Sequence, residues 1–91
     1  MARTYTVVLL HEQDGRYSAI VPALECASWG HTIPEALRMV EEALRCHLAS
    51  LEKHGDPIPP DSDTFTVDMG DATDALIYKV TVREREAAFV A

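Results

Sequence analysis

The chain has 91 residues, of which 47% are apolar and 25% are charged. This length and composition predict one folded domain over residues 1–91 with a single two-layer core, and they exclude a wholly disordered chain. The formal net charge of −7 disfavours direct binding to nucleic acid, and no apolar run is long enough for a membrane span.

The first part of the chain predicts three strands. Residues 4–11 are rich in β-branched and aromatic side chains and are apolar on both faces, which is typical of a central or covered strand. Asp14 and Gly15 predict a hairpin turn that returns the chain into a second strand over residues 16–21. Pro22 ends this strand, because it lacks a backbone N–H. Residues 26–31 are predicted to form a short third strand.

A long amphipathic helix is predicted over residues 33–54. Thr32 and Glu35 have the spacing of a capping box, in which Glu35 reaches back to the amide of Thr32, and Pro34 fits the first turn. Gly55 suits the position after the helix, and Pro57 prevents its continuation. The predicted apolar stripe recurs every three or four residues and consists of Ile33, Leu37, Val40, Leu44, Leu48 and Leu51.

The remaining sequence predicts a linker and a last strand. Residues 56–63 are proline-rich and form the linker. Residues 64–69 alternate apolar and polar side chains, which fits either a strand or a loop with its apolar side chains tucked in. Residues 75–83 alternate more clearly and predict a strand. The order β-β-β-α-β favours an α+β two-layer sandwich, with a small antiparallel sheet and one long helix on one face. The other face is expected to be partly exposed.

No convergent set of catalytic or metal-binding residues is apparent. The histidines and cysteines lack the spacing of a typical metal site, so neither a metal nor a cofactor is expected. Both cysteines are expected to be buried, inert thiols. The carboxylate pairs Glu41–Glu42 and Asp71–Asp74 are adjacent on a helix or lie in a turn, so they favour no acid–base chemistry. The low number of cysteines and the absence of a recognisable signal peptide favour a cytoplasmic protein.

Contacts with other chains are the better candidates for a site. Trp29, the only tryptophan, is interpreted either as a core side chain, which the pattern favours, or as an interface anchor. The last strand is interpreted as a possible pairing edge. The candidate contact residues for a homo-oligomer or a partner are Trp29, Tyr78, Val80, Val82 and Phe89.

Two motifs resemble those of the HicB-like antitoxin family, whose members also include small stand-alone proteins. The first is Gly-x-Tyr-x-Ala-x-x-Pro, which begins here at Gly15. The second is Gly-x-Thr-x-x-Glu-Ala, which begins at Gly30. The resemblance covers residues 4–59, and residues 75–83 match the last strand of the family. It implies a partial ribonuclease-H-like fold and no catalytic residue in this chain.

The resemblance also implies a function in a HicA/HicB-type toxin–antitoxin system. An antitoxin of this family neutralises a small basic toxin that cleaves messenger RNA, and it is commonly a dimer or tetramer. The chain departs from the family in the turn from Pro22 to Cys26, where the usual Pro-Gly is missing. No DNA-binding segment follows residues 75–83 in this sequence, so operator binding is not expected.

Three functional hypotheses remain open at this point. The first is an antitoxin-like protein that binds a basic toxin by complementary charge and a strand edge. The second is a homo-oligomeric structural, regulatory or ligand-binding module that has no toxin partner. The third is an enzyme with a degenerate ribonuclease-H-like site, which requires a metal-dependent nuclease activity.

Overall fold

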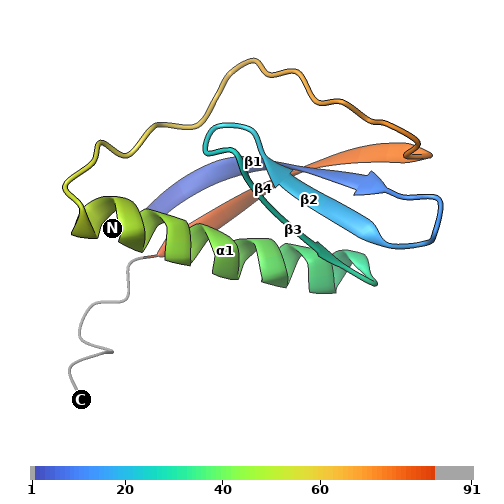
Figure 1. Ribbon diagram of the computed structural model, residues 1–91, viewed down its shortest axis with the longest axis horizontal. Coiled ribbons are helices and arrows are strands. Elements are labelled where there is room, and N and C mark those ends of the chain that lie inside the picture. Colours follow the sequence, from blue (N-terminus) through green and yellow to red (C-terminus); the bar gives the residue numbers. More distant parts are fainter. Residues whose placement is uncertain (1, 84–91) are drawn as a thin grey trace.

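The computed structural model describes residues 2–83 and contains four strands and one helix in these residues (Figure 1). The elements are β1 (Ala2–His11), β2 (Tyr17–Val21), β3 (Cys26–Gly30), α1 (Ile33–Lys53) and β4 (Asp74–Arg83). They form one antiparallel sheet of order β3-β2-β1-β4. The predicted α+β sandwich and its β-β-β-α-β order are therefore confirmed. Residues 64–69 form a loop and not a strand.

The β1–β2 hairpin closes at the glycine that the sequence singled out. Gly15 has a φ of 94°, a conformation that favours glycine. The amide of Glu12 donates to the carbonyl of Arg16 over 2.8 Å, and the amide of Gly15 donates to the carbonyl of Glu12 over 3.0 Å. These bonds set the register in which Leu9 faces Ala19, and this register directs the small side chain of Ala19 into the core.

The turn from β2 to β3 contains a strained residue. Glu25 is the single non-glycine residue with positive φ in the described part of the chain, with φ at 52°. It lies directly before Cys26, in the turn where the family pattern has Pro-Gly. This left-handed conformation costs a residue with a Cβ about 1–2 kcal/mol. The shorter turn of this chain is therefore strained at Glu25.

Both ends of α1 carry side-chain or backbone caps. The hydroxyl of Thr32 accepts from the amide of Glu35 over 3.2 Å, as the capping box predicts. The carboxylate of Glu35 accepts from the amide of His31 over 2.6 Å, and not from that of Thr32 as the sequence suggested. At the other end, the amides of Gly55 and Asp56 donate to carbonyls in the last turn, and Gly55 has a φ of 70°. This pair of bonds is a Schellman motif.

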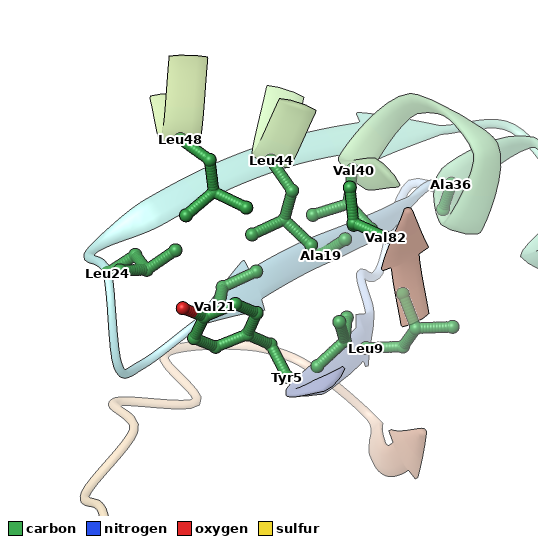
Figure 2. Packing of buried hydrophobic residues seen from close by; sticks show 11 residues of the cluster. Tyr5, Leu9, Ala19, Val21, Leu24, Ala36, Val40, Leu44, Leu48 and Val82 are labelled. Atoms are coloured by element: carbon green, nitrogen blue, oxygen red, sulfur yellow. The ribbon is translucent and has the colours of Figure 1, made fainter. Parts of the chain in front are cut away.

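The core lies between α1 and one face of the sheet. Figure 2 shows side chains of α1 pointing at side chains of the strands. A fully buried side chain such as Leu44 contributes about 1.5–3 kcal/mol to folding. The buried cluster consists of Tyr5, Val7, Leu9, Ala19, Val21, Leu24, Ala36, Val40, Leu44, Leu48 and Val82.

The long segment between α1 and β4 lies on the other side of the sheet from the helix (Figure 1). Thr6, Val8 and Leu10 alternate with the core residues of β1, and are nevertheless 3%, 3% and 4% exposed. This segment, which includes the linker, therefore covers part of the second face of the sheet. Phe65 and Met69 in the same segment are 37% and 40% exposed, so these apolar side chains are not fully tucked in.

Candidate protein-interaction surface

An exposed aromatic side chain stands on the second face of the sheet. Trp29 alternates with the inward-facing residues of β3 and is 48% exposed, so the interpretation as a core residue is wrong. The guanidinium of Arg16 lies 5.1 Å from the centre of its indole ring, within the range of a cation–π contact. The ring of His31 meets Trp29 edge-on at 5.2 Å. Two neighbours thus hold the indole in place while half of its surface faces solvent.

A groove of about 570 Å³ runs beside Trp29. Its apolar lining comes from three strands and from the loop before β4, through Leu10, Ile20, Ala27 and Met69. Ile20 and Ala27 face each other directly across β2 and β3. Aromatic and methionine side chains around an apolar depression are typical of the centre of a protein–protein interface.

Acidic side chains line the same groove. Glu12, Asp68 and Asp71 contribute to its lining. Glu12 accepts a hydrogen bond from the hydroxyl of Ser18 over 2.7 Å, and Asp68 accepts from the amide of Gly70 over 2.9 Å. The basic group in the lining is Arg16, which pairs with Asp14 at 2.8 Å. The groove therefore combines an apolar centre with a mainly acidic margin, which suits a partner with basic and apolar side chains.

A polar cluster anchors the linker beside this surface. One oxygen of the Asp61 carboxylate accepts from the amide of Thr6 over 2.9 Å, and the other accepts from its hydroxyl over 2.7 Å. The ammonium of Lys79 donates to the same hydroxyl over 2.7 Å and to Asp61 over 3.1 Å. Partial burial opposes ionisation of Asp61, but the bonds from Thr6 and Lys79 outweigh it and lower its pKa from 3.8 to about 2.

The structure gives a reason for this anchor. The pairing of β1 with β2 extends over four pairs, from Val8↔Ile20 to His11↔Tyr17. Pro22 follows the end of β2, so β1 lacks a β2 partner from Thr6 backwards. Asp61 supplies the missing acceptor for the amide of Thr6. This role of the linker was missed in the sequence, because Asp61 lies 55 residues from Thr6 and carries no local signal.

Within residues 2–83, the histidine, cysteine and carboxylate side chains do not gather into a metal-binding or catalytic site. These residues contain no cluster of three histidine, cysteine or carboxylate side chains that could hold a metal ion. Cys26 is half-buried, and burial raises the pKa of its thiol, with a smaller contribution from Cys46. Cys46 itself is exposed, so its predicted burial is wrong. Glu41 pairs with Arg45 at 2.6 Å, as expected for a surface helix. In the same residues, no helix is long and apolar enough to cross a membrane.

The structure distributes the candidate contact residues over different environments. Trp29 is exposed, whereas Val82 belongs to the buried core. Tyr78 and Val80 are half-buried against that core. Phe89 lies outside the described residues. Of the four described candidates, Trp29 offers the most side-chain surface to a partner, whereas β4 offers its backbone edge.

Relatives of this chain are found among curated proteins. A UPF0150 protein of Thermoplasma acidophilum is 44% identical over 59 residues, which are 64% of this chain and 86% of the relative. A second UPF0150 protein, from Synechocystis sp., is 41% identical over 56 residues, which are 60% of this chain and 71% of that relative. The chain belongs to the UPF0150 family. No family model matches it.

UPF0150 is a HicB-like family, so the resemblance seen in the sequence is confirmed. The N-terminal domain of the Burkholderia pseudomallei antitoxin HicB matches this structure with a TM-score of 0.66. The match covers 89% of this chain and 99% of that domain, at 21% identity. This UPF0150 chain therefore has the fold of the HicB N-terminal domain.

The motif residues of this UPF0150 chain build its frame and not the exposed surface. Gly15 makes the hairpin turn, and the ring of Tyr17 stacks on His11 with centroids 4.4 Å apart. Ala19 is fully buried between α1 and the sheet. Thr32 caps the helix. These motifs therefore identify the fold, and the candidate contact residue Trp29 lies between them.

Proposed function

We propose that this protein is an antitoxin-like binding protein that neutralises a small, basic, RNA-cleaving toxin in the cytoplasm by covering it. The observation that carries this proposal is the match to nearly the whole N-terminal domain of an antitoxin. The net charge of −7 supports it, because an acidic surface attracts a basic partner and speeds their encounter. In this proposal the role of the protein is binding, without catalysis.

The contact surface in this proposal is the groove beside Trp29. Its apolar lining suits the buried centre of an interface, and Glu12, Asp68 and Asp71 suit the basic side chains of the toxin. Trp29 is the anchor, since a rigid aromatic side chain in a pocket commonly contributes most to binding.

A capture experiment tests the proposal. The tagged chain is captured from its own host and is also co-expressed with the product of the neighbouring gene, and the purified species are weighed by native mass spectrometry. We expect a complex of fixed stoichiometry that dissociates at high salt, because the attraction is partly electrostatic. A homo-oligomer alone, free of the co-expressed protein, would refute the antitoxin proposal.

The second candidate is a stand-alone homo-oligomeric module without a toxin. The observation that favours it is the position of β4 at the edge of the sheet. In the same experiment, this candidate predicts a single homo-oligomeric mass with and without the neighbouring gene.

A further inference from the structure

The outer edge of β3 presents a defined set of backbone groups. The carbonyl of Arg16, just before β2, accepts from the amide of Glu12, just after β1. In an antiparallel pair, residues that point their polar backbone groups at the partner strand alternate with residues that point them away. Ala19, three residues further along, therefore points its groups at β3, where it faces Ser28. The neighbours of Ser28 point their N–H and C=O groups outward, and these are Ala27 and Trp29.

Both ends of this edge are closed. The amide of His31, the next outward group after Trp29, donates to the carboxylate of Glu35 over 2.6 Å. Glu25, two positions before Ala27, has a φ of 52° and turns the chain out of the strand. Between these ends, no other described residue donates to or accepts from the outward backbone groups. An uncovered stretch of this kind is a template for a short added strand.

One face of this edge opens into the groove. The side chains of Ala27 and Trp29 are exposed, and both residues line the groove. Because the side chain of Ala27 ends at its Cβ atom, a long side chain from an added strand can cross it towards Ile20. Lysine and arginine fit this path, since their aliphatic stems cover apolar surface while the charged end stays in water. The charged end is then drawn towards the acidic margin, to which Asp68 and Asp71 belong.

The other face of this edge continues the core. Cys26 and Ser28 lie opposite Val21 and Ala19, which belong to the buried cluster, so they point to the helix side. Both are half-buried. In an added strand, the residue beside Ser28 points to this side as well, because facing residues share a face of the sheet. An apolar side chain suits this position.

We propose that this edge of β3 binds an extended segment of the partner as an additional strand of the sheet. Side chains of the segment alternate between basic residues on the groove face and apolar residues on the helix face. Main-chain bonds to Ala27 and Trp29 hold the segment, and the acidic margin selects its charge. The origin of the segment rests on the proposed function, whereas the edge and its preference do not.

A second copy of β3 suits this edge less well. β3 carries no charged side chain, so it offers nothing to the acidic margin. Its own helix also approaches it closely at Gly30. Neighbouring strands lie about 4.8 Å apart, whereas packed helices need about 8–10 Å, so two such edges would bring their helices too close together. A segment without a covering helix avoids this conflict.

The first test measures amide hydrogen exchange by NMR with a defined probe, the end-blocked peptide Val-Lys-Val-Arg-Val. In the chain alone, we expect fast exchange at Ala27 and Trp29 and slow exchange at Ser28, whose amide points at β2. A saturating amount of the peptide is expected to slow exchange at Ala27 and Trp29 at least about tenfold. The control is Lys79 on the other edge of the sheet, whose amide points outward because that of the facing Thr6 points away from β4.

Three outcomes of this test would overturn the inference. Unchanged exchange at Ala27 and Trp29 would show that the edge does not take up the peptide. Slowed exchange at Lys79 instead would place the peptide on β4. Slow exchange at Ala27 and Trp29 in the chain alone would show that a second copy already occupies the edge.

A second test separates main-chain pairing from charge. An N-methyl group on the arginine of the peptide removes an N–H that faces β3, and it is expected to raise the dissociation constant at least about tenfold in an NMR titration. The same group on the central valine, the control, removes an N–H that points away and should change the dissociation constant less than about twofold. Val-Glu-Val-Glu-Val is expected not to bind, because the margin repels it. Equal effects of the two methyl groups, or binding of the glutamate peptide, would contradict the proposed strand.

Variants of the chain separate this inference from the antitoxin proposal. Ala27→Pro removes an outward N–H and keeps the β2 ladder, since a proline is tolerated at a strand edge, and Ala27→Ser is the control. For the protein captured from the host, Ala27→Pro is expected to raise the dissociation constant at least about tenfold at unchanged circular dichroism. Equal binding of both variants would refute the edge and leave the antitoxin proposal standing. If no protein is captured, the antitoxin proposal fails, and the peptide still decides the inference, as it does if the proline variant does not fold.

Discussion

Gly30 at the end of β3 lies against Ala36 in the first turns of α1. A Cβ atom at Gly30 would lie 2.6 Å from the backbone nitrogen of Ala36 and 2.9 Å from its Cα. Strand and helix therefore approach each other more closely here than a side chain permits, and Ala36 is fully buried. This contact explains in physical terms why glycine occupies the first position of the second motif, because a Cβ there would overlap the backbone of α1.

We expect Gly30→Ala to lower the free energy of unfolding by about 1–3 kcal/mol, because the backbone of one element has to move. Urea unfolding, followed by circular dichroism, measures this difference. The control is Ala27→Ser at an exposed position of the same strand, with an effect within about 0.5 kcal/mol. Equal stability of Gly30→Ala and wild type would contradict the close approach.

Asp61 is expected to make stability depend on pH in the acid range. Its pKa is about 2 in the folded protein against 3.8 in the unfolded chain, so its contribution is complete above about pH 4 and is lost as the pH falls towards 2. Asp61→Asn should lower the free energy of unfolding by about 1–2 kcal/mol at pH 6, mainly because the bonds to Thr6 are weakened. The ion pair with Lys79 contributes little, since the Lys79 side chain is 63% exposed.

Unfolding free energies at pH 6 and pH 2 check this expectation. The difference between wild type and Asp61→Asn should shrink towards pH 2, because the wild-type carboxylate becomes protonated. The matched control is Asp63→Asn, an exposed carboxylate two residues away, which should have little effect at either pH. A constant difference at both pH values would argue against the depressed pKa.

Most of the fold was predictable because its signals are local. The alternation of 75–83, the turn at Gly15 and the cap at Thr32 each act over a few residues, and each prediction is confirmed. The bond between Asp61 and Thr6 depends on where the linker passes the sheet. That path follows from tertiary packing, so the sequence alone gave no sign of it.

Which side chains form the exposed candidate surface was less predictable, because exposure also depends on tertiary packing. On a short strand at the edge of a sheet, alternation tells which residues share a face, but not which face is covered. The pattern therefore favoured a core position for Trp29 over the alternative of an interface anchor, whereas the helix lies over the opposite face of the sheet. Val82 was assigned to a contact surface and lies in the core for the converse reason.

Glu25→Gly is expected to stabilise the protein. Glycine removes the strain at a φ of 52°, and its greater freedom in the unfolded chain offsets part of this gain. We expect a net gain of about 0.5–1 kcal/mol in the free energy of unfolding. Glu25→Ala, which keeps the Cβ, is the control and should give no such gain. A loss of stability in Glu25→Gly would contradict the interpretation of the turn.

Trp29→Ala is expected to weaken binding of the basic partner at least about tenfold, as for an anchor residue at the centre of an interface. Isothermal titration calorimetry with the purified partner measures the dissociation constant. The control is Met39→Ala, because Met39 is 39% exposed on α1, away from the groove. If Met39→Ala weakens binding and Trp29→Ala does not, the partner binds the helix side instead.

The most direct test of the antitoxin proposal is an assay of messenger-RNA cleavage by the protein that is captured with this chain from its own host. The account predicts that adding the chain at equal molar amounts abolishes cleavage, and that Trp29→Ala requires a larger excess. Cleavage that continues unchanged in the presence of excess wild-type chain would contradict the account.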